Sequence, residues 1–145
     1  REEFLRSECG ADAELLDDLL NMKLSQRVKY DAERNILFLN LEGYSVRKKS
    51  DIQDLQQVLV EACQKAGKRV HSVVNHAGSR IAEDLFDTYA AMVEYMMKNH
   101  YIDTKRYTTS TFMRLKMQEA LDRRGVAPHV FERADKAPEA KDAAE

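Results

Sequence analysis

Strand-like and helix-like stretches alternate along most of this chain, and that alternation limits its fold more than any other sequence feature. The stretch ILFLNL (36–41) is apolar at consecutive positions, which is typical of a central strand that is buried on both faces. A second strand is expected over residues 27–30, and the turn-rich residues 31–35 separate the two. The sequence therefore predicts a β-hairpin near the start of the fold.

Amphipathic helices follow the hairpin. The first is expected to begin at Ser50 or Asp51 as its N-cap and to end near Ala66, where Gly67 provides the usual helix-terminating residue. Its apolar residues recur at helical spacing and form one stripe: Ile52, Leu55, Val58, Leu59 and Ala62. Two further helices are predicted over residues 84–98 and 111–121, the second capped by Ser110 or Thr111.

Short strand-like stretches lie between and after these helices, at residues 69–74, 105–109 and 129–131. Strands that alternate with helices pair in parallel through right-handed crossovers. We therefore predict an α/β domain over residues 23–131, with a small mixed four- or five-stranded sheet (β-hairpin, then α-β-α-β-α-β) covered by helices. This layout resembles that of STAS-like domains, the sulfate-transporter and anti-sigma-antagonist class.

The two ends of the chain are acidic and flank a mildly basic body. Residues 1–22 hold seven acidic and two basic residues, and the helical periodicity of 11–21 predicts an acidic N-terminal helical segment. Residues 132–145 are rich in Ala, Lys, Glu and Asp, and we predict a disordered tail there. The whole chain has a net charge of −2, so no nucleic-acid partner is expected.

Composition and the chain start bear on location. No apolar run approaches the roughly 18 residues that a membrane helix needs, so no membrane partner is expected. Two cysteines, Cys9 and Cys63, are too few for a disulfide framework, which favours a reduced, cytoplasmic compartment. The chain begins at Arg1 rather than at Met, and we expect it to be a piece of a larger protein.

The sequence contains none of the common spacings of metal or cofactor sites. The four histidines form no H-x-x-x-H pair, and neither a P-loop nor a G-x-G-x-x-G motif occurs. Cys63 lies on a helix, where a small buried residue is the plainest interpretation. We therefore predict no catalytic residue, no metal site and no cofactor for the chain by itself.

Polar residues gather where predicted parallel strands end, which is the edge at which open α/β sheets bind ligands. Hydroxyl groups and the free N–H groups of a helix start make an anion site conceivable there, although the hydroxyls alternatively serve only as helix caps. The candidate ligand-binding residues are Asn75, His76, Ser79, Arg80, Arg106, Thr108, Thr109 and Ser110.

Six segments in order resemble a known family: VKYD (28–31), NILFLNLEG (35–43), VVN (73–75), DLFDTY (84–89), RYTTS (106–110) and RGVAPH (124–129). Together they cover roughly residues 24–131 and are similar to the C-terminal extension of bacterial acyl-CoA:acetate/3-ketoacid CoA-transferases, the propionate CoA-transferase-like proteins. The resemblance implies upstream CoA-transferase domains in the same polypeptide, and these would carry the catalytic glutamate. It implies a non-catalytic accessory role for this chain, in packing, oligomerisation (including a homo-oligomer) or regulation.

One loop departs from the family pattern. After VVN (73–75) the family has Tyr-Asp-Asn-Phe, whereas this chain has HAGS (76–79). The alternative is a free-standing STAS-like module that recognises an anion, a nucleotide or a partner protein through this loop, with Ser79 as a candidate phosphorylation site.

Overall fold

The computed structural model describes residues 23–127 and 130–131, so the expected N-terminal helical segment and C-terminal tail lie outside the described residues. A sheet of five strands forms the centre, in the order β1-β2-β4-β6-β7. β1 (Val28–Asp31) and β2 (Ile36–Asn40) form the predicted antiparallel hairpin. β4 (Val70–Asn75), β6 (Tyr101–Tyr107) and β7 (Val130–Phe131) add in parallel, which confirms the mixed α/β sheet.

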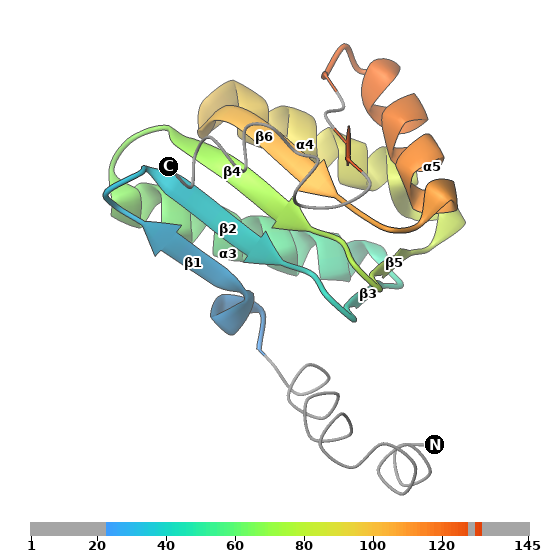
Figure 1. The fold of residues 1–145 in the computed structure, drawn as a ribbon, viewed down its shortest axis with the longest axis horizontal. Coiled ribbons are helices and arrows are strands. Elements are labelled where there is room, and N and C mark those ends of the chain that lie inside the picture. Colours follow the sequence, from blue (N-terminus) through green and yellow to red (C-terminus); the bar gives the residue numbers. More distant parts are fainter. Residues whose placement is uncertain (1–22, 128–129, 132–145) are drawn as a thin grey trace, which may run out of the picture.

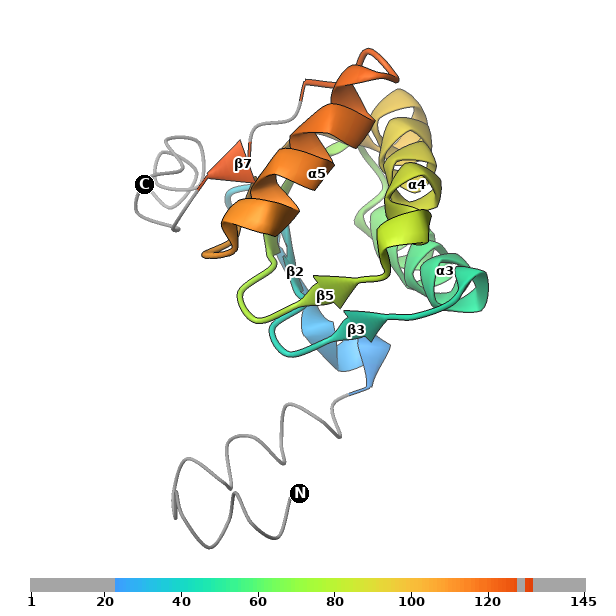
Figure 2. The same ribbon diagram turned by 90° about the vertical axis from the view of Figure 1, so that its right-hand side faces the viewer.

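Within residues 23–127 and 130–131, three α-helices accompany the sheet. α3 (Lys49–Ala66) and α4 (Phe86–Asn99) lie together on one face, and α5 (Thr111–Asp122) lies beside α4 near β7 (Figures 1 and 2). The core fills the space between helices and sheet, and Leu55, Leu59 and Met96 are each at most 2% exposed within it. The predicted stripe of the first helix is confirmed in Ile52, Leu55 and Leu59, whereas Val58 and Ala62 are only partly buried.

Several predicted element limits are wrong. α3 has Lys48 as its N-cap, and Asp51, in the first turn, accepts hydrogen bonds from the backbone N–H groups of Arg47 (2.8 Å) and Lys48 (3.1 Å). β6 begins at Tyr101 and ends at Tyr107, not over 105–109. The predicted helix 84–98 is a 3-10 turn, η2 (Glu83–Leu85), followed by α4.

Short elements that were not predicted complete the fold. A 3-10 turn, η1 (Leu24–Arg27), precedes β1, and a two-stranded parallel pair joins β3 (Ser45–Val46) to β5 (Arg80–Ile81). The β3–β5 pair brings the loop after β2 next to the loop after β4. Gly43 N donates to the Ala77 carbonyl (3.3 Å) where the two loops meet.

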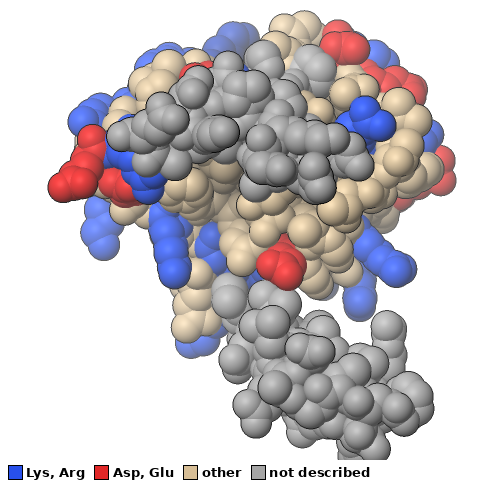
Figure 3. Space-filling model, viewed as in Figure 1, with Lys and Arg blue, Asp and Glu red and all other residues tan. Residues whose placement is uncertain are grey.

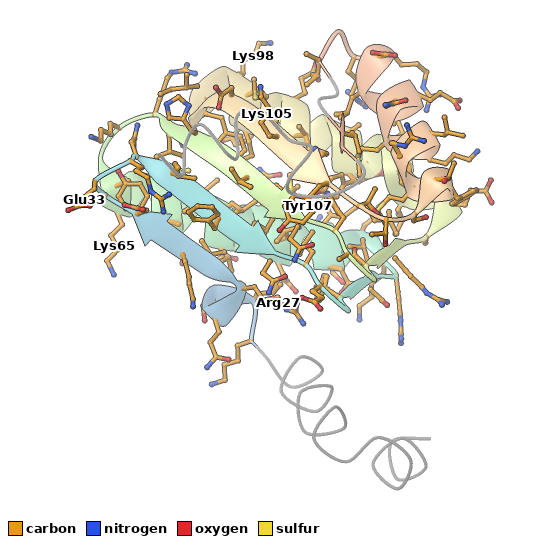
Figure 4. All side chains as sticks on the ribbon, in the orientation of Figure 1. Arg27, Glu33, Lys65, Lys98, Lys105 and Tyr107 are labelled. Carbon is orange, nitrogen blue, oxygen red and sulfur yellow. The ribbon has the colours of Figure 1, made fainter. Side chains whose placement is uncertain are left out.

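The Arg27 side chain holds the loop after β2 through hydrogen bonds to its backbone. Its Nη1 donates to the carbonyls of Asn40 (3.1 Å) and Glu42 (2.8 Å), and its guanidinium lies 5.3 Å from the ring centre of Tyr44. Figure 4 shows Arg27 at the junction of the 3-10 turn and the end of β2. Gly67 ends α3 in the left-handed conformation at φ 75°, as predicted.

Candidate functional site

The carboxyl ends of β2, β4 and β6 lie level with one another, as expected for the ligand-binding edge of an α/β sheet. Asn40 is paired in register with Asn75, and Asn75 with Tyr107. The Asn75 amide donates to Asn40 Oδ1 (3.2 Å), and its own Oδ1 accepts from the backbone N–H of Ala77 (2.8 Å). Asn75 therefore shapes the turn after β4.

Arg106 lies inside the protein. Lys105 and Tyr107 lie on one face of β6 (Figure 4). Strand alternation places Arg106 on the other face, where it contacts Tyr89 of α4. It is 1% exposed, and its guanidinium lies within hydrogen-bond distance of His76 Nε2 (3.3 Å), Tyr89 OH (3.3 Å) and Thr104 Oγ1 (3.4 Å). None of these partners is a carboxylate, and its Nε has no hydrogen-bond partner.

His76 is buried beside this guanidinium. Desolvation, and then the charge of Arg106, hold the pKa of His76 well below its usual value of 6.5, so the ring is neutral. Because Arg106 can only donate, Nε2 of His76 must be the acceptor, which leaves the proton on Nδ1. That Nδ1–H is buried and has no hydrogen-bond partner.

A surface hollow of about 450 Å³ lies at the start of α5. Four of the predicted site residues line it: Ser79, Arg80, Thr109 and Ser110. The remaining lining is largely apolar and was not predicted: Gly78, Ile81, Phe86, Phe112 and Met113. The hollow is therefore lined by both polar and apolar side chains.

Caps account for part of the predicted polar cluster. Ser110 Oγ accepts from the backbone N–H of Met113 (3.1 Å) and caps α5, as predicted. Thr108, which is 2% exposed, accepts through Oγ1 from the Ser110 N–H (3.1 Å). Thr109 is exposed at the hollow. Ser110 thus caps the helix and also lines the hollow.

The eight predicted residues therefore do not form one site. His76, Arg106 and Thr108 are internal, Asn75 is half-buried, and Ser79, Arg80, Thr109 and Ser110 line the hollow. The aromatic part of the lining was not predicted, because a Phe at the start of a helix, such as Phe86, is most simply explained as a core residue. An exposed Phe112 next to a predicted cap was the available signal, since it lies off the buried face of α5.

Other reactive groups lie elsewhere in the described residues. The Cys63 thiol is 3% exposed, and burial raises its pKa to about 11, which fits the predicted core role. His71 Nδ1 lies 3.0 Å from Asp103 Oδ1, and both side chains are about one-third exposed. Within residues 23–127 and 130–131, no group of three or more His, Cys, Asp or Glu is placed to hold a metal ion.

The surface charge and the character of the helices also bear on possible partners. In the view of Figure 3, basic side chains of the described part lie around the rim with acidic ones among them, rather than in one stripe. None of the helices in the described ranges combines the length and the apolar character that crossing a membrane requires.

Comparisons of the chain with models of protein families, with curated proteins and with solved structures found no match.

Proposed function

We propose that the chain is a non-catalytic accessory domain of a cytoplasmic CoA-transferase, an enzyme that moves CoA between a short-chain acyl-CoA and a carboxylic acid. The proposal starts from the ordered resemblance of residues 24–131 to the C-terminal extension of such enzymes. Its partners are the upstream CoA-transferase domains of the same polypeptide. Packing, self-association and regulation are the roles open to it.

The observation that carries the proposal is that His76 and Cys63, two residue types common in catalysis, are both buried. A general base must reach the proton that it removes. His76 is 1% exposed, and it contacts the Arg106 guanidinium and the edge of the Tyr89 ring rather than a carboxylate. Cys63 is buried with a raised thiol pKa. The described polar residues thus favour structural and binding roles over covalent chemistry.

The test is an activity measurement on the natural polypeptide. An antibody against this chain should capture a protein that transfers CoA from an acyl-CoA to acetate, whereas the isolated 145-residue chain should show no transfer. Capture of a protein without transferase activity, or transfer by the isolated chain, contradicts the proposal.

The second candidate function is a binding module that recognises an anion at the end of the sheet. The hollow at the start of α5 favours it, because polar side chains and a helix N-terminus converge there. Modification of Ser79 fits the structure poorly, since its side-chain oxygen is buried and a kinase needs an accessible hydroxyl. Calorimetric titration of the chain with inorganic phosphate tests this function, and absence of binding would exclude it.

A further inference from the structure

A groove of about 480 Å³ lies between β1 and α3, away from the hollow at the start of α5. β1 contributes Val28 and Tyr30 to its lining, and α3 contributes Val58, Ala62 and Ala66. The Tyr30 hydroxyl already donates to an amide oxygen in the hairpin turn (2.7 Å), so its polar end needs no further partner. The groove therefore offers a largely apolar surface.

The apolar stripe of α3 is wider than the part that the sheet covers. Val58, Ala62 and Ala66 recur every four residues and form one row along the helix. All three are only partly buried, and all three line the groove. An amphipathic helix reaches its stable state when its whole apolar stripe is packed against other elements. A further apolar element laid along this row would complete the burial of α3.

β1 forms one edge of the five-stranded sheet among the described residues. The outer backbone groups of an edge strand lack a neighbouring strand, and proteins commonly cover such an edge with a helix or a loop. Val28 and Tyr30 are partly buried and line the groove beside this edge. A single helix in the groove would cover both the row on α3 and the edge of β1.

The segment before the described residues suits the groove in pattern, length and position. Residues 11–21 are predicted to be helical from the spacing of four leucines, at positions 15, 16, 19 and 20. A helix of this length is about 16 Å long, and the row from Val58 to Ala66 extends over about 12 Å. Ser25, only four residues after position 21, already lines the groove. Such a short connection keeps the local concentration of the segment at the groove high.

The chain connection also fixes the direction of a helix docked in this way. α3 and β1 run in the same direction in Figure 1, and Figure 4 shows Lys65, near the end of α3, close to the tip of β1. The segment joins the described chain at the other end of the groove, near Ser25, so it would run antiparallel to α3. Glu61 and Lys65 give the lining one charge of each sign, so apolar contact rather than charge must drive docking.

We propose that residues 11–21 form an amphipathic helix that docks in the groove of its own chain, with the leucine stripe against Tyr30, Val58 and Ala62. This is the helix-in-groove mode of recognition. The inference goes beyond the proposed function and does not depend on it, because the groove and the segment belong to the same chain. Within the CoA-transferase proposal, the docked helix would fix how this domain is joined to the domains before it.

The test is hydrogen–deuterium exchange of the full 145-residue chain, resolved to single amides by nuclear magnetic resonance. A helix of this length is marginal in water by itself, so its amides exchange freely unless the helix is docked. The amides of residues 15–21 should exchange at least about tenfold more slowly than those of an unstructured chain, at every chain concentration. Unprotected amides would overturn the proposal. Protection that grows with chain concentration would also overturn it, because a second copy would then supply the helix.

Matched variants locate the docking surface. Ala62→Glu places a charge in the groove and should remove the protection of residues 15–21. Gln64→Glu introduces the same side chain on the same helix, at an exposed position outside the groove, and should keep the protection. Equal protection in the two variants would contradict docking at this groove.

A second pair of variants keeps the test decisive if Ala62→Glu does not fold, because it changes only the segment. Leu19→Gln interrupts the leucine stripe, and the amide resonances of residues 58–66 should shift. Asn21→Gln introduces the same side chain about 200° further around the helix and should leave these resonances in place. Groove resonances that stay unmoved in Leu19→Gln, or that move equally in both variants, would contradict the proposal.

Discussion

Arg106 in β6 shows how far the position of one side chain can be predicted from the sequence. The sequence predicts Arg106 as a ligand-binding residue at the carboxyl edge of the sheet, whereas its side chain is 1% exposed and lies inside the protein. Alternation in β6 places Arg106 on the same face as Thr104, and its contact with Tyr89 shows that this face is covered by α4. A buried guanidinium with only neutral partners then follows from register, which no local sequence motif encodes.

His76 should make stability depend on pH. Its folded-state pKa lies well below 6.5, so below pH 6.5 the unfolded state binds a proton that the folded state does not. Stability should therefore fall as the pH drops from about 7 to 5, by at most about 1.4 kcal/mol per pH unit for this one proton. Urea unfolding at several pH values measures the effect.

The variant His76→Gln isolates this contribution, because its amide oxygen preserves an acceptor for Arg106 while the titrating ring is lost. The parent should lose more stability than the variant between pH 6.5 and 5, and the other histidines cancel in the comparison. Parallel pH profiles for the two proteins would show that His76 is not held neutral.

Among the helices and strands, the residues at which each element begins and ends were the least predictable feature. The stripe of α3 was visible because Leu55 and Leu59 recur at helical spacing. The β3–β5 pair was missed because two-residue strands carry no periodicity, and tertiary contact between two loops creates them. The start of β6 was missed because the exposed Ile102 and the half-buried Asp103 break the apolar pattern of a central strand.

Asp51 should stabilise α3 from its first turn rather than as its N-cap residue. Asp51→Ala removes the acceptor for the backbone N–H groups of Arg47 and Lys48, at a cost of about 1 kcal/mol. Asp54→Ala is the control, because it changes the same charge at an exposed position further into the helix. Equal urea midpoints for the two variants would contradict the capping role.

Leu59 tests the packing of α3 against the sheet. It is 2% exposed, so Leu59→Ala should lower the free energy of unfolding by about 2–5 kcal/mol. Gln57→Ala, on the exposed face of the same helix, should change it by less than about 0.5 kcal/mol. A negligible shift of the Leu59→Ala unfolding midpoint would mean that this helix face is not core.

The fold class of the whole molecule was predictable from the alternation of strands and helices, because parallel pairing restricts the possible arrangements. The mixed sheet followed from the hairpin, whose antiparallel β1 is the one exception among its strands. Only the polar lining of the hollow was predictable, since its aromatic lining depends on how α4 and α5 meet. Phe86 and Phe112 are 26 positions apart in the sequence, and only tertiary packing brings them together.

Membership of a CoA-transferase polypeptide is the central claim, and the mass of the native protein tests it most directly. An antibody against this chain should detect, in denaturing electrophoresis of source-cell extracts, a band several times heavier than the 16.7 kDa of the chain. Such a band is the predicted result, because CoA-transferase domains would precede residue 1. A band at 16.7 kDa would contradict the claim and leave the anion-binding module as the remaining function.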